Sequence, residues 1–191
     1  MRKLAKTLTG IALSLSIAIC NVCTTYTQAV YGYKLLADMS DCKCYYTDTY
    51  SYTYGITTMR GAISWHNTTL PFDLYWHRTT SATDREVSAG IDSNLGEGTL
   101  AETHFYYEIS STVNNRVYPS QSNWTHCIIY VNDTVLDSST GYDTTAHEFG
   151  HVMGLAHNNT NPNSIMCQKR FGRTATRPSA VDFVKLASIY S

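Results

Sequence analysis

The sequence predicts an α+β fold in a single domain. Two patterns support this class, because apolar residues recur at helical spacing in some segments and alternate with polar residues in others. The chain has 191 residues, of which 43% are hydrophobic, and this is enough to build a buried core. It contains no evident internal repeat and no second domain boundary.

Three segments are predicted to be helical. In 52–65 the apolar residues follow one another at intervals of four, three and four positions, namely Tyr52, Ile56, Met59 and Ile63. A second helix is expected over 140–153. A third is expected over 179–190, where Pro178 stands at the entrance and apolar residues keep helical spacing.

Strands are predicted between these helices. Apolar and polar residues alternate over 72–76, and short β-branched or aromatic runs bounded by turn residues occupy 103–107 and 127–131. Residues 80–98 are rich in Ser, Thr, Asp and Gly and are expected to form a loop. Residues 30–49 lack clear periodicity, so we expect an irregular N-terminal arm rich in Cys and Tyr, followed by the folded domain over 50–191.

The N-terminus has the features of a secretory signal peptide. Arg2, Lys3 and Lys6 precede an apolar stretch over 8–19, and Thr27-Gln28-Ala29 resembles a cleavage triplet. The apolar stretch is shorter than the roughly 20 residues that span a bilayer. We therefore expect residues 1–29 to be removed, leaving a secreted protein without a transmembrane anchor.

The charge balance of the chain argues against nucleic acid and anionic membranes as partners. Fourteen Lys and Arg residues against fifteen Asp and Glu residues give a formal net charge of −1, without a basic stripe that would attract nucleic acid or anionic membranes. We expect a monomer that does not bind nucleic acid.

Four cysteines follow the predicted signal peptide, namely Cys42, Cys44, Cys127 and Cys167. An even number in an oxidising compartment predicts disulfide bonds. A bridge between Cys42 and Cys44 would be strained, so each is expected to pair with Cys127 or Cys167, in either of two connectivities. The alternative is that the four are buried free thiols or metal ligands.

The segment 147–157 contains the candidate metal ligands and the candidate general base of this chain. On a helix, His147 and His151 lie on one face a single turn apart, and Glu148 borders the same site. Gly154 can adopt a left-handed conformation that ends the helix and returns His157 to the first two histidines. Three neutral imidazoles around Zn²⁺ leave a fourth position for water, which is typical of a catalytic site. Glu148 would accept the proton of that water and pass it to the departing amine.

This segment resembles the metzincin zinc endopeptidases, because every fixed position of H-E-x-x-H-x-x-G-x-x-H is present. Phe149, Gly150 and Leu155 resemble the matrixin branch in particular. The resemblance implies a secreted zinc endopeptidase that acts on polypeptides. It also implies an α+β catalytic domain with a twisted mixed sheet of about five strands, a zinc-binding helix, a Met-turn and a C-terminal helix.

Further segments resemble the same family. Ser164-Ile165-Met166 is similar to the Met-turn, which implies that Met166 forms an apolar floor under the zinc ligands. Asp182 matches the residue of the C-terminal helix that supports this turn. Leu100 and Ala101 belong to a G-x-L-A stretch similar to the edge strand along which an extended substrate binds.

Two family features are missing. The chain has no P-R-C-G-x-P-D-like segment, so the cysteine that silences many matrixins has no counterpart by motif, and Cys42 and Cys44 are candidates by their chemistry alone. The H-x-D motif associated with a second zinc and with calcium is also missing, and the four remaining histidines lack that motif, namely His66, His77, His104 and His126. We expect one catalytic Zn²⁺, and calcium finds no support in the sequence.

A second function class accounts for the same motif. A zinc-holding, peptide-binding or adhesin-like surface protein would keep the three histidines and lack turnover. The tyrosine-rich arm would suit such a role.

Overall fold

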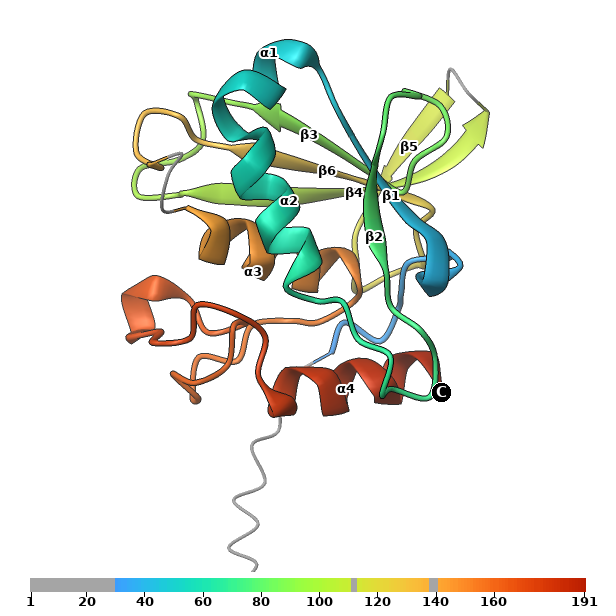
Figure 1. Ribbon diagram of the computed structural model, residues 1–191, viewed down its shortest axis with the longest axis vertical. Helices are drawn as coiled ribbons and strands as arrows, with labels where there is room; N and C mark the ends of the chain where they lie inside the picture. The colour runs from blue at the N-terminus through green and yellow to red at the C-terminus, as the bar shows by residue number, and fades with distance from the viewer. Residues whose placement is uncertain (1–29, 111–112, 138–140) are drawn as a thin grey trace, which may run out of the picture.

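The computed structural model describes residues 30–110, 113–137 and 141–191, and the predicted signal peptide lies outside them. Within these ranges the protein is α+β, as expected. A mixed sheet forms the upper layer in Figure 1, with helix α3 beneath it and helix α4 below α3. None of the described helices has the length and apolar content needed to cross a membrane.

The sheet has six strands in the order β2-β1-β3-β6-β4-β5, where about five were expected. The first four in this order run parallel, and β4 is antiparallel to both of its neighbours. The strands are β1 (Cys42–Tyr46), β2 (Trp76–Thr79), β3 (Val87–Ile91), β4 (Ala101–Ser110), β5 (Val113–Val117) and β6 (His126–Val131).

Two central strands lie where the sequence predicts none. β1 falls inside the expected irregular arm 30–49, and β3 falls inside the expected loop 80–98. Both are short, and each pairs with strands on its two sides, so the neighbouring strands stabilise them more than local propensity does. The strand expected over 72–76 shares only Trp76 with β2, and β5 was not predicted.

The helices agree better with the sequence. Helix α3 (Tyr142–Val152) and helix α4 (Ala180–Tyr190) match the expected segments within two residues. The segment expected over 52–65 is divided into a π-helical stretch, Ser51–Gly55, and helix α2 (Ile56–Ile63), which follow the one-turn helix α1 (Asp48–Tyr50).

The buried face of α2 differs from the apolar stripe in its sequence. Ile56 and Ile63 are 72% and 49% exposed, whereas Gly61 is buried against α3. A Cβ at Gly61 would lie 2.3 Å from the hydroxyl oxygen of Thr145, so the two helices approach too closely for a larger side chain. Small and polar residues therefore make this contact.

The predicted disulfides are absent, because all four described cysteines are buried free thiols. Cys44 lies opposite Val87, and Val87 lies opposite Cys127, so two strand spacings separate the two cysteines. Two spacings of about 4.8 Å place their Cα atoms about 10 Å apart. A disulfide requires less than about 7 Å. The Cys167 thiol donates to the carbonyl oxygen of Gln168 at 3.5 Å.

Two buried tryptophans attach α3 to the rest of the fold. Trp65 Nε1 donates to the carbonyl oxygen of Ala146 at 2.8 Å, and Trp124 Nε1 donates to that of Val152 at 2.8 Å. Phe149 packs edge-on against Trp76, which is buried on β2. These contacts hold the middle and the C-terminal end of the helix that carries His147 and His151.

Candidate metal centre

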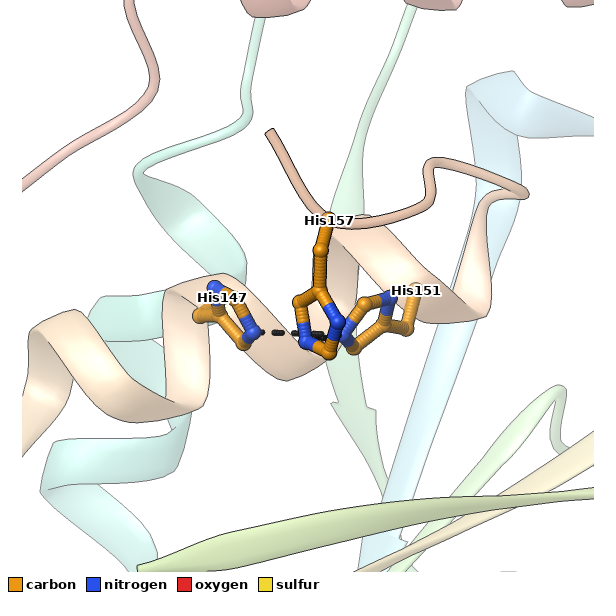
Figure 2. Close-up of side chains that lie close together, drawn as sticks. All are labelled: His147, His151 and His157. Carbon is orange, nitrogen blue, oxygen red and sulfur yellow. Dashed lines mark hydrogen bonds between the residues drawn. The ribbon is translucent and has the colours of Figure 1, made fainter. Parts of the chain in front are cut away.

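His147 and His151 stand one turn apart on α3, and both side chains are almost fully buried. Figure 2 shows the two rings on the same side of the helix, with His157 from the following segment beside them. The Nε2 atom of His151 lies 3.1 Å from Nε2 of His147 and 3.1 Å from Nε2 of His157. The structure therefore brings the three predicted ligands together.

Gly154 makes this convergence possible. Its φ of 103° lies in the left-handed region, and a Cβ there would come within 3.0 Å of the carbonyl oxygen of Tyr33. Two backbone bonds close the end of the helix, because Gly154 N donates to His151 O and Leu155 N donates to Gly150 O. The chain then turns back and presents His157, as expected from the position of the glycine.

The environment keeps the three imidazoles neutral. Burial lowers the pKa of His147 well below its ordinary value, and the neighbouring His151 lowers it further. Burial lowers the pKa of His151 to about 3. The pKa of His157 is lowered by partial desolvation of its ring and then by the Arg170 cation. Neutral imidazoles are the form that binds metals.

This set of donors fits a tetrahedral metal ion. Zinc–nitrogen bonds of about 2.0–2.1 Å place two ligand nitrogens about 3.3 Å apart. The observed separations of 3.1 Å are close to that value. His147 Nδ1 donates to Ile165 O at 2.7 Å, and His151 Nδ1 lies 2.8 Å from Leu155 O, so both Nε2 atoms keep a lone pair toward the centre. Among the described residues, these three histidines form a group that could hold a metal ion.

Glu148 lies next to the histidines and contacts the sheet. Its Oε2 atom accepts a hydrogen bond of 2.7 Å from the hydroxyl of Thr103 on β4. Burial raises the pKa of Glu148 to about 7, and the Thr103 bond and the Arg173 cation oppose this rise. A carboxyl group with a pKa near neutrality can accept and return a proton.

The turn at Met166 lies under α3. A Cβ at Gly150 would be 2.2 Å from Met166 Sδ, so the sulfur packs directly on the helix backbone. The buried Asp182 carboxylate accepts hydrogen bonds from the Ser164 hydroxyl and from Ile165 N. It also accepts from Ser179 and so caps α4. Met166 thus packs on α3, and Asp182 holds the turn that carries it.

Arg173 joins the same turn to α3. Its Nη1 atom donates to Ile165 O at 3.2 Å and to Cys167 O at 3.4 Å. Its Nη2 atom donates to the Asp143 carboxylate at 3.3 Å, in the first turn of α3. Ile165 O therefore accepts from both Arg173 and His147.

A pocket of about 340 Å³ opens beside the histidines. Leu100 and Ala101 line it, and residues 101–104 of β4 pair with β6, whereas the pairing with β5 begins at Phe105. The expected edge strand is therefore an edge over 101–104 alone, because β4 lies between β6 and β5 in the sheet and Leu100 precedes the strand, and this part of β4 borders the pocket. Gln168, Lys169, Arg170 and Arg173 also line the pocket.

The other four histidines lie away from this centre. His66 stacks on Tyr75, and His77 lies 3.5 Å from the Asp41 carboxylate. His104 lies 2.9 Å from the Glu102 carboxylate. His126 is buried beside Ser88. None belongs to a three-ligand group within the described ranges.

Three residues of the site were not predicted, namely Tyr31, Thr103 and Arg173. Tyr31 lies in the expected arm, and its hydroxyl is 3.0 Å from Nδ1 of His151. Thr103 begins the expected strand 103–107, and inward alternation on that strand is the signal that places its side chain toward α3. Arg173 belongs to no recognisable motif.

Comparison of the chain with protein-family models and with curated protein sequences gave no match.

Proposed function

We propose that this protein is a secreted zinc-dependent endopeptidase of the metzincin type, similar to matrixins. The observation that carries the proposal is the convergence of three imidazole Nε2 atoms beside the buried Glu148 carboxylate, in one open pocket. The sequence resemblance over 147–157 supports the family, and the expected signal peptide supports secretion.

Each residue of the site has its own role in the proposed peptide-bond hydrolysis. His147, His151 and His157 would hold Zn²⁺, which supplies a Lewis acid that polarises a peptide carbonyl and acidifies water. Glu148 accepts the proton of the attacking water and returns it to the leaving amine nitrogen. Thr103 orients the Glu148 carboxylate during both transfers.

The substrate is an extended polypeptide. The 101–104 part of β4 borders the pocket and has a side that β5 does not pair. A peptide can add there as a further strand, with main-chain hydrogen bonds that do not depend on its sequence. Its scissile bond would then lie over Glu148.

The decisive test is the Glu148→Gln variant. This change preserves the size of the side chain and leaves the imidazoles intact, so zinc content and melting temperature should match those of the wild type. Cleavage of an unfolded protein should fall at least ~100-fold, because general acid–base catalysis contributes ~10²–10⁴-fold.

Glu108→Gln is the matched control, since Glu108 lies farther along β4 beside Arg85 and should leave cleavage unchanged. Wild-type activity should also disappear with a chelator and return with zinc. A wild type that binds zinc but cleaves no polypeptide would favour the peptide-binding class. Full activity of Glu148→Gln would remove Glu148 from the mechanism.

A further inference from the structure

The segment 30–36 is tied to the end of the helix that carries the histidines. Tyr31 N donates to Gly154 O at 3.1 Å, and Val30 forms an antiparallel bridge with Leu155. At its other end, Leu36 N donates to Trp124 O at 2.7 Å. The segment is therefore fixed on both sides of Tyr31.

The Tyr31 side chain lies between the sheet and His151. Its ring packs edge-on against Phe105, with centroids 5.8 Å apart, and its hydroxyl oxygen is 3.0 Å from His151 Nδ1. Burial raises the pKa of Tyr31 above its ordinary value, and the Glu148 charge raises it further, so the hydroxyl stays protonated at neutral pH. Tyr31 also lines the pocket.

The tautomer of His151 determines whether the Tyr31 hydroxyl accepts or donates the hydrogen bond with Nδ1. A metal at Nε2 requires the proton to be on Nδ1, so Nδ1–H donates. Two oxygen acceptors lie within reach of that proton, the carbonyl of Leu155 at 2.8 Å and the hydroxyl of Tyr31 at 3.0 Å. Acceptors from two separate segments restrain the ring in the plane that points Nε2 at the other histidines.

We propose that Tyr31 is a positioning residue of the metal centre, which orients His151 through its hydroxyl. The inference rests on the proposed metal-binding function and adds to it that the segment 30–36 is part of the metal centre. Tyr31 is close to the expected cleavage site after Ala29, so cleavage there would make the segment that supports His151 the first part of the mature chain.

The test compares Tyr31→Phe with Tyr33→Phe in otherwise intact protein. Phenylalanine keeps the ring that packs on Phe105 and removes only the hydroxyl. Tyr33 belongs to the same segment, and its side chain is 39% exposed, so it is the matched control. Zinc affinity is measured without substrate, by competition with a chromophoric chelator. The absorption spectrum of the Co²⁺-substituted protein reports the geometry of the ligands.

Loss of an outer hydrogen-bond partner typically weakens metal affinity ~10–100-fold, and we expect Tyr31→Phe to fall in that range with an altered Co²⁺ spectrum. Tyr33→Phe should bind as the wild type does. Equal affinities and spectra for the two variants would overturn the proposal. So would weak binding by Tyr31→Leu combined with normal binding by Tyr31→Phe, because the ring alone would then matter.

Failure of the Tyr31 inference can be distinguished from failure of the proposed function. A wild type that binds no zinc would reject the proposed function and this inference together. A wild type that binds zinc and cleaves polypeptides, with a normal Tyr31→Phe variant, would reject this inference alone.

Discussion

The hydroxyl of Thr103 donates to Oε2 of Glu148 across 2.7 Å, and this bond joins the strand that borders the pocket to the helix that carries the histidines. Thr103 is 9% exposed and Glu148 is 5% exposed, so water competes little with the bond. The strand thus sets both the orientation and the proton affinity of the proposed general base.

Removing this hydroxyl should shift the pH dependence of cleavage. The bond stabilises the charged carboxylate and lowers the pKa of Glu148, so Thr103→Val should raise that pKa. The protonated acid cannot accept a proton, and the acidic limb of the pH–rate profile should move to higher pH. The profile of kcat/KM checks this, with Thr83→Val in an exposed loop as the control. An unchanged acidic limb would contradict the role of Thr103.

The third ligand can be tested by metal content. His157→Ala should reduce zinc occupancy and activity together, because two imidazoles on one helix do not complete a tetrahedral site. The affinity should fall by more than the ~10–100-fold typical of outer hydrogen-bond partners. His77→Ala, on β2 beside Asp41, should keep its zinc. Unchanged zinc content in His157→Ala would exclude His157 as a ligand.

Asp182 should matter for stability. Its carboxylate accepts from Ile165 N at 3.1 Å and from Ser179 N at 2.8 Å, and both donors would lose their partner in Asp182→Ala. We expect a loss of about 2–6 kcal/mol in the free energy of unfolding, since each of the two unpaired donors costs about 1–3 kcal/mol. Denaturant unfolding of the metal-free protein measures it.

The control is Asp84→Ala, which removes an exposed ion pair with Lys43. Such pairs contribute about 0–1 kcal/mol. Equal losses for the two variants would mean that Asp182 does not support the Met166 turn.

The contact between Gly150 and Met166 predicts a steric effect. A Cβ at position 150 would lie 2.2 Å from Met166 Sδ, so Gly150→Ala should displace the sulfur and destabilise the fold by about 1–3 kcal/mol. Gly90→Ala adds the same methyl group where the nearest atom is 3.9 Å away, and it should be tolerated far better. Thermal melting compares the two variants. Equal melting temperatures would show that the Met166 side chain can move aside without loss of stability.

Local sequence was enough to predict the helices at the site. The i, i+4 spacing of His147 and His151 fixes both on one face of any α-helix, and Gly154 marks where that helix ends. Helical hydrogen bonds are made within a segment, so α3 and α4 follow from their own residues. The Met166 turn and Asp182 are expected from the resemblance alone, and in the structure the Asp182 carboxylate accepts from Ser164 and Ile165 of that turn.

The two central strands, the state of the cysteines and the contacts of Tyr31 and Thr103 depend on segments that are distant in the sequence. β1 and β3 are strands because each has a partner on both sides, which neither short segment encodes. The position of Cys44 and Cys127 on strands that are not adjacent rules out a bridge between them. Tyr31 reaches His151 from 120 residues away, and Thr103 reaches Glu148 from 45 residues away. Such pairs depend on sheet order and helix packing, and these arise only when the whole chain has folded.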